Sequence, residues 1–214
     1  MALYQLYSKW NISDRNDWSL LQIQEMKLIF IDTETTGVIR ERHEIVQLAA
    51  IVTNEDASEM LDEINITIRP ELIDTIDPAD IAVCHKTVDD LLANEYSMKE
   101  AHKVFCDFLG KHINKYDRND KAQLVAYNSP FDEDFVRLLF DRCGDHYYGS
   151  WFWNPSLCVM REFAFLIRDN RHKIENFRLC TICEFLGIEF DEDNDAHDAL
   201  YDVRKTIEIF KKLI

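Results

Sequence analysis

Hydrophobic and polar positions change their spacing several times along the chain, and each change marks an expected element. The segment 27–33 contains the unbroken apolar run Leu28–Ile31, which is typical of a strand buried on both faces. Similar apolar runs predict four more strands, the last of them short: 44–53, 61–69, 123–127 and 156–160.

Helical spacing appears between and after these strands. It is clearest after Ser97, because Ser97 and Glu100 form a capping-box pattern ahead of an apolar stripe. Further helices are expected as two short pieces within 76–92 and at 131–143, 159–168, 178–186 and 196–213. Three strands in succession, and then strands alternating with helices, predict an α/β domain with a mixed sheet covered by helices.

The first 26 residues differ from the rest. At 214 residues the chain has room for one core and a short extra arm. Leu3 and Trp10 belong to an apolar stripe at helical spacing within 1–26, and we expect this arm to pack on the main domain, 27–214. An oligomer contact is the alternative, so the oligomeric state stays open.

Composition and charge limit the class of protein. Hydrophobic residues make up 47% of the chain, and no stretch has the length of a membrane span, so we expect a soluble, cytoplasmic protein. Of the six cysteines, Cys180 and Cys183 have the spacing of half a zinc site, but no second pair follows and buried thiols are favoured. The net charge of −16 disfavours a broad basic surface for long nucleic acid.

Two acids directly follow the first buried run. Residues two apart in an extended chain point to the same side, so Asp32 and Glu34 are expected to project together. Two carboxylates held together away from water cost free energy unless a cation lies between them or one is protonated. The sequence therefore predicts a metal site; an acidic pair at an exposed sheet edge is the alternative.

Three more candidate residues occur later in the chain. Asp132 lies in the first turn of the helix after strand 123–127, where an acid suits the helix dipole. Asp202 lies on the flank of the apolar stripe of the last helix. His197 is about 140° away from Asp202 on a helix, so we expect it in the first turn with Asp195 as N-cap. A neutral histidine there suits a general base. A plain capping acid and a surface histidine are the alternatives.

Taken in chain order, the segments DTETTG, AYNSPFDEDFV and HDALYDV resemble the three exonuclease motifs of the DEDDh (DnaQ-like) family. This family includes the proofreading subunit of bacterial DNA polymerase III, ribonuclease T and oligoribonuclease. The matched motif positions are Asp32, Glu34, Asn128, Phe131, Asp132, Phe135, His197 and Asp202. The resemblance extends over 27–213, with Tyr127 where many relatives have histidine.

The resemblance implies a ribonuclease H-like fold with a five-stranded mixed sheet, and a hydrolase that removes nucleotides from the 3' ends of single-stranded nucleic acid. It implies two Mg²⁺ ions, replaceable by Mn²⁺, held by Asp32, Glu34, Asp132 and Asp202. Asp32 would bridge both ions, and His197 would take the proton of the attacking water.

The same resemblance implies how substrate and partners are recognised. Contacts to the terminal nucleotide would come from Thr35, Thr36, Asn128 and Phe135, whereas Phe131 is expected in the core. DNA is favoured over RNA as substrate, in proofreading or repair, with a polymerase or another replication protein as partner and no role at a membrane.

Two other functions compete with this interpretation. Residues 191–202 place acids in an EF-hand frame, but Ala196 stands where the sharp turn needs glycine and Asp202 where glutamate is usual. A catalytically silent relative that only binds nucleic acid or a polymerase is the second. Such a protein would be expected to lack a metal ligand, and all the motif acids are present.

Overall fold

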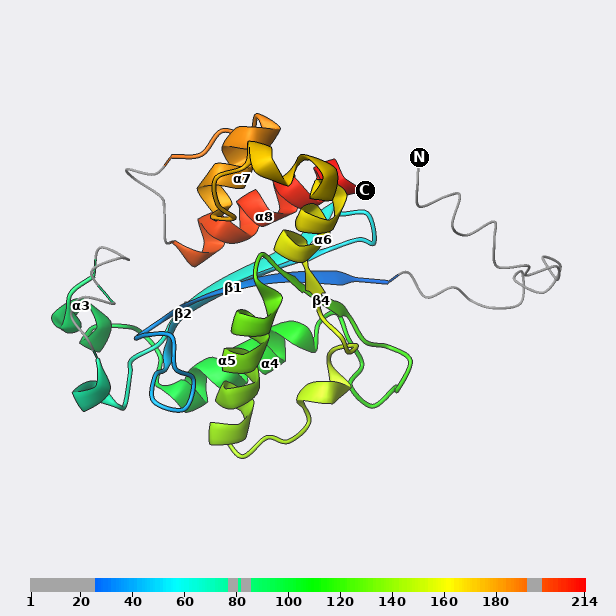
Figure 1. Cartoon of the computed structure of the whole chain (residues 1–214). Helices are drawn as coiled ribbons and strands as arrows, with labels where there is room; N and C mark the ends of the chain where they lie inside the picture. The colour runs from blue at the N-terminus through cyan, green and yellow to red at the C-terminus, as the bar shows by residue number, and fades with distance from the viewer. Residues whose placement is uncertain (1–25, 77–80, 82–85, 192–197) are drawn as a thin grey trace, which may run out of the picture.

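A five-stranded mixed sheet runs through the molecule in the order β3-β2-β1-β4-β5 (Figure 1). The computed structural model describes residues 26–76, 81, 86–191 and 198–214. Strands β1 (Leu28–Thr35), β2 (Ile45–Thr53) and β3 (Met60–Thr67) pair antiparallel. Strands β4 (Gln123–Ala126) and β5 (Leu157–Cys158) run parallel to β1. The predicted mixed sheet is confirmed. The N-terminal arm, which was expected to pack on the main domain, lies outside the described residues except at its last position.

Helices cover both faces of this sheet (Figure 1). One layer contains α4 (Met98–Leu109) and α5 (Ser129–Arg142). The other contains α6 (Val159–Leu166), α7 (Leu179–Leu186) and α8 (Ala199–Leu213). Shorter helical pieces are α3 (Val88–Leu92), η1 (Ile73–Thr75), η2 (Tyr148–Ser150) and η3 (Arg168–Lys173). None of the described helices has the length and apolar character needed to cross a membrane.

Alternation along β1 decides which layer each side chain faces. Ile29 and Ile31 belong to the apolar cluster of α4 and α5. Leu28 and Phe30 belong to the cluster of α6, α7 and α8, where the Phe30 ring meets that of Phe210 at 5.3 Å. The next positions continue this alternation, so β1 sends Asp32 toward the α8 layer and Thr33 toward α5.

The predicted starts of helices α4 and α8 have different outcomes. Helix α4 has the expected capping box of Ser97 and Glu100. The start predicted for the last helix is wrong, because α8 begins at Ala199 and its N-cap is Asp198, not Asp195. The Asp198 carboxylate accepts hydrogen bonds from the backbone N–H groups of Leu200 and Tyr201, which stabilises this later start.

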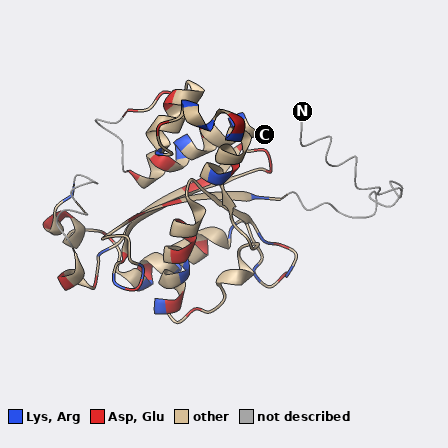
Figure 2. Ribbon diagram, viewed as in Figure 1, with Lys and Arg blue, Asp and Glu red and all other residues tan. Residues whose placement is uncertain are grey.

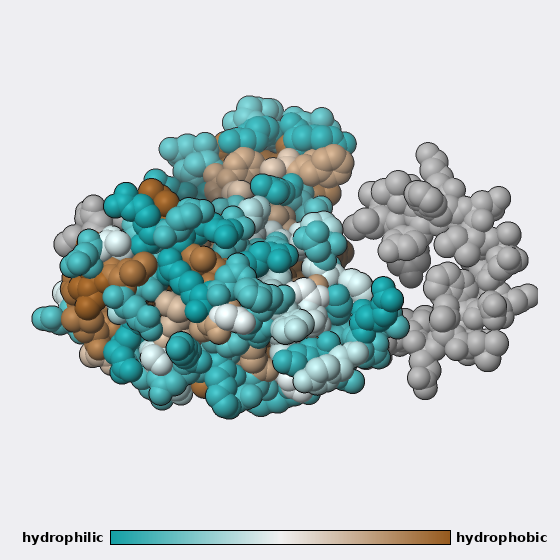
Figure 3. All heavy atoms as spheres, turned by 90° about the horizontal axis from the view of Figure 1, so that it is seen from below, coloured by the Kyte–Doolittle hydropathy of each residue, from teal (hydrophilic) through white to brown (hydrophobic). Residues whose placement is uncertain are grey.

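The face that carries α4 and α5 has a largely hydrophilic surface (Figure 3). Apolar side chains gather mainly at the end of the molecule that carries η1 and α3, where Leu72, Ile73 and Leu92 are exposed. Residues of both charge signs are spread over the helices of the two layers (Figure 2). Basic and acidic residues are therefore interspersed on the described helices.

Candidate active site

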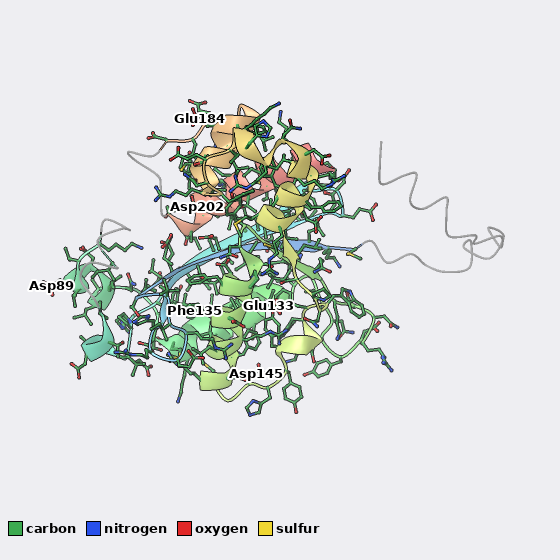
Figure 4. The ribbon with its side chains drawn as sticks, in the orientation of Figure 1. Asp89, Glu133, Phe135, Asp145, Glu184 and Asp202 are labelled. Carbon is green, nitrogen blue, oxygen red and sulfur yellow. The ribbon has the colours of Figure 1, made fainter. Side chains whose placement is uncertain are left out.

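Three carboxylates from two elements meet at the end of β1. Oxygens of Asp32 and Glu34 on β1 and of Asp202 on α8 lie within 4.8 Å of one another. Figure 4 places Asp202 at the boundary between the α8 layer and the sheet. The predicted projection of both β1 acids to one side, and the flank position of Asp202, bring these three groups together.

The fourth acid, Asp132, reaches the site from the opposite helix layer. It lies in the first turn of α5 and is 3% exposed. Its Oδ1 accepts hydrogen bonds from the backbone N–H of Thr33 at 3.0 Å and from the Thr33 hydroxyl at 2.9 Å. Thr33 therefore orients Asp132 beside the acids that flank Thr33 in β1.

The pKa values show that these acids are held together at a cost in free energy. Burial raises the pKa of Asp32 well above its usual value, and the charges of Asp132 and Asp202 raise it further. Burial likewise raises the pKa of Asp132 to about 7, against the opposing effect of its Thr33 hydrogen bonds. For Asp202, burial and then the charge of Glu34 raise the pKa to about 7.

The donor set fits hard divalent cations. Oxygen ligands are those that Mg²⁺ prefers, and a cation would remove the repulsion among the acids. In addition, Asp202 Oδ1 is buried and has no hydrogen-bond partner among the described residues. A buried carboxylate oxygen without a donor is costly, and a metal ion is the partner that the surrounding acids can share.

The structure also reveals neighbours that sequence reasoning missed. Gln47 in β2 is 3% exposed, and its amide donates to Asp198 Oδ2 at 2.9 Å. The side-chain oxygen of Gln47 accepts a hydrogen bond from Lys86 at 3.0 Å. Asp198 is thus a fifth acid close to the site, and its charge raises the pKa values of Asp32 and Asp202. Asp198 falls inside the last helix predicted from the sequence, so no capping role was expected for it.

The residues expected to contact the nucleotide differ in how far they are buried. Thr35 is half-buried, and Asn128 is exposed at the end of β4 without a capping hydrogen bond. The Thr36 side chain is 1% exposed and accepts a hydrogen bond from the backbone N–H of Glu44. The Thr36 hydroxyl thus helps to close the loop between β1 and β2 in this conformation, and its contact with the terminal nucleotide stays a prediction.

The two phenylalanines of the second motif have the reverse of the expected burial. Phe135 was expected to contact the terminal nucleotide, but it is 2% exposed and packs in the core of the α4 and α5 layer. Phe131 was expected in the core, yet it is only partly buried, with its ring 4.9 Å from that of Phe135. Residues 131 and 135 are four apart and share one face of α5, but Phe131 lies in the first turn at the end of the helix and packs only against the border of the core that encloses Phe135.

His197 and Asp195 lie outside the described residues, as does half of the EF-hand frame, 192–197. The described end of that frame does not support a calcium loop. Asp198 caps α8, and Asp202 gathers with the acids of β1.

This sheet and its acid site define a DnaQ-like exonuclease of the DEDDh type with a ribonuclease H-like fold. Residues 29–210 match the RNase T exonuclease family, and the chain belongs to that family.

Two relatives and two solved structures illustrate the likeness. The chain is 26% identical to DNA polymerase III PolC-type of Bacillus cereus over 201 residues, which are 93% of this chain and 12% of that protein. It is 28% identical to the PolC-type enzyme of Oceanobacillus iheyensis over 208 residues, or 96% and 12% of the two chains. The chain thus spans about an eighth of the length of these relatives.

The solved structures support the fold. E. coli exonuclease I in complex with a dT13 oligonucleotide superposes with a TM-score of 0.71 at 21% identity, covering 88% of this chain and 41% of the other. The zinc-bound complex of E. coli exonuclease I with single-stranded DNA gives a TM-score of 0.70 at 21% identity, covering 88% and 40%.

Proposed function

We propose that the protein is a 3'-5' exonuclease that releases nucleoside monophosphates from the 3' end of single-stranded DNA by two-metal-ion hydrolysis. The observation that carries this proposal is the gathering of Asp32, Glu34 and Asp202 within 4.8 Å, with Asp132 held beside them by Thr33. Family membership supports hydrolysis of a nucleic acid from an end.

The charges of the site suit a pair of divalent ions. Asp32, Glu34, Asp132 and Asp202 supply four negative charges when ionised, which two divalent cations balance. Two Mg²⁺ ions bound there would activate the attacking water and stabilise the leaving oxygen. Mn²⁺ accepts the same oxygen ligands and should substitute for Mg²⁺.

Each side chain has a distinct task in this proposal. Asp32 lies near enough to Asp132 and Asp202 for their charges to raise its pKa, so it would help to hold both ions. Glu34 and Asp202 would complete the ligand set beside the attacking water, and His197 would accept the proton of that water. Thr33 keeps Asp132 oriented while its charge is neutralised.

Two observations favour a short single-stranded DNA end as the substrate. The relatives are DNA polymerases of the PolC type, and exonuclease I structures contain DNA oligonucleotides. The net charge of −16 opposes a long nucleic-acid footprint, because each further phosphate beyond the metal ions meets repulsion. A replication or repair polymerase is the partner that the PolC relationship suggests.

The test is a cleavage assay with end-labelled substrates. Single-stranded DNA, single-stranded RNA and a duplex with a mismatched 3' end are incubated with the protein and Mg²⁺. A ladder that shortens from the 3' end of the DNA, with nucleoside monophosphate as product, supports the proposal. Equal cleavage of RNA would contradict the preference for DNA, which depends on contacts at the 2' position.

A second candidate, a catalytically silent relative, predicts binding without products. The matched control is the Asp202→Asn variant, which keeps the shape of the side chain and removes a ligand charge. Binding without cleavage by both the parent protein and this variant would favour the silent relative.

A further inference from the structure

A second group of metal-ligand atoms lies far from the acids of β1. The imidazole of His102, the thiol of Cys106 and the carboxylate of Asp145 place one ligand atom each within 4.8 Å of one another. His102 and Cys106 are four residues apart on α4, so they share one face of that helix. Asp145 follows α5, and Figure 4 shows it on the side of the sheet opposite to Asp202.

Backbone geometry places Asp145 firmly. Gly144 adopts φ +75°, a conformation that favours glycine, and turns the chain back after α5. The Asp145 N–H then donates to the Phe140 carbonyl at 2.9 Å, as in a Schellman ending. Asp145 Oδ1 accepts a hydrogen bond from the Tyr147 N–H at 2.8 Å, so Oδ2 is directed at His102. The two oxygens of this carboxylate therefore have separate tasks.

The ring of His102 is also fixed. It meets the Phe140 ring edge-on, with centroids 4.7 Å apart and an interplanar angle of 85°. The side chain of His102 is 15% exposed and that of Asp145 is 17% exposed, so small ions still have access. His102 and Asp145 are thus oriented by packing and hydrogen bonds before any ion binds.

The two separations from His102 Nε2 have the values of a tetrahedral transition-metal site. His102 Nε2 lies 3.5 Å from Cys106 Sγ and 3.3 Å from Asp145 Oδ2. Metal–ligand bonds of about 2.0 Å to nitrogen or oxygen and about 2.3 Å to sulfur, at tetrahedral angles, separate these donors by about 3.5 and about 3.3 Å. The observed separations agree with that geometry.

A nucleophilic thiol relay is a poorer explanation of the same cluster. In such a relay the base contacts the nucleophile through one ring nitrogen and the orienting acid through the other. Here both Cys106 and Asp145 face the same atom, Nε2 of His102. Burial raises the pKa of Cys106 to about 12, which also disfavours a free thiolate.

We propose that His102, Cys106 and Asp145 form a binding site for Zn²⁺ or a similar borderline-soft divalent ion, which joins α4 to the end of α5. The mixed nitrogen, sulfur and oxygen donors suit such an ion better than Mg²⁺, which prefers oxygen. Water completes the fourth position. Binding releases the proton of the Cys106 thiol, and His102 binds in its neutral form, which its lowered pKa favours because of burial.

The test uses Co²⁺ as a spectroscopic substitute for Zn²⁺, with the full chain kept reduced. The parent protein should develop a thiolate-to-cobalt charge-transfer band and tetrahedral visible bands that saturate at one ion per cluster, and Zn²⁺ should abolish them. The Asp32→Ala variant should keep these bands, because the acid site offers no thiolate. No charge-transfer band in the folded parent protein would overturn the proposal.

Variants assign the ligands. Cys106→Ser should remove the charge-transfer band, whereas the matched control Cys180→Ser on α7 should keep it. His102→Ala should weaken Co²⁺ binding by at least about tenfold. A loss of that size is the lower end of what is seen when a residue that only supports a ligand is removed, and removal of a ligand should cost at least as much. A band that persists in a Cys106→Ser protein with parental circular dichroism would contradict the assignment. If Cys106→Ser does not fold, Asp145→Asn, which keeps the shape of the side chain, gives the same test through affinity.

Discussion

The two ligand clusters of this protein lie at opposite ends of helix α5. Asp132 lies in the first turn of this 14-residue helix and Asp145 lies just beyond its end, a separation of roughly 20 Å at the usual rise per residue. The cluster at the end of β1 has oxygen ligands only. The cluster at the end of α5 has one nitrogen, one sulfur and one oxygen ligand.

This contrast shows how the type of ligand atom and the charge of a cluster decide which metal ions each cluster suits within one fold. The acids of β1, α5 and α8 repel one another strongly and raise one another's pKa values, so hard ions of high charge density fit them. Burial lowers the pKa of His102, which favours its neutral form, and Cys106 adds a negative charge to its cluster only when a metal displaces the thiol proton. We therefore expect catalysis at the first cluster and structural support at the second.

The largest effect should separate the two clusters by activity. Asp32→Ala should reduce cleavage to background and abolish the rise in melting temperature that Mg²⁺ or Mn²⁺ gives the parent protein, since that rise reflects preferential binding to the folded state. Cys106→Ser should keep Mg²⁺-dependent cleavage. The measurements are labelled-DNA cleavage and thermal unfolding with and without Mn²⁺. If Mn²⁺ left the melting temperature of the parent protein unchanged, this would argue against metal binding at the acid site.

A smaller effect should distinguish the general base from the ligands. His197→Ala should lower turnover by roughly 10² to 10⁴ while leaving metal binding nearly intact, because a base moves a proton without holding the ions. Single-turnover cleavage and Mn²⁺ titration report the two properties separately. If turnover at neutral pH were unchanged, His197 would be a surface histidine and not the general base.

The smallest effect concerns pH and has opposite signs at the two clusters. Without metal, Asp132 and Asp202 have pKa values of about 7 in the folded protein, against a usual value of 3.8. The folded state then binds more protons than the unfolded state between these values, so stability should fall as the pH rises through this range. The lowered pKa of His102 does the reverse, and its contribution is lost as the pH falls below the usual value of 6.5.

Thermal unfolding in a chelator from pH 4 to 8 checks this difference. Asp202→Asn should flatten the loss of stability toward neutral pH, and His102→Gln should flatten the loss below the usual histidine pKa. An Asp202→Asn profile parallel to that of the parent protein would show that the acids are not held together as described.

Local spacing by itself predicted much of this molecule. The apolar run Leu28–Ile31 predicted β1, and the two-residue period predicted that Asp32 and Glu34 project together. The capping box of Ser97 and Glu100 predicted the start of α4. These features depend on neighbours within one element, whose geometry is set by backbone periodicity.

Only the tertiary structure decided which layer each side chain faces and which distant residues meet. Thr33 contacts Asp132 across 99 positions, and Gln47 contacts Asp198 across 151. The same packing buried Phe135 and Thr36, which sequence reasoning had assigned to the substrate. It also brought Asp145 to His102, a contact that no local sequence pattern predicted. Periodicity gives the direction of a side chain within its own element, whereas the partner it meets depends on the path of the whole chain through the sheet and its two helix layers.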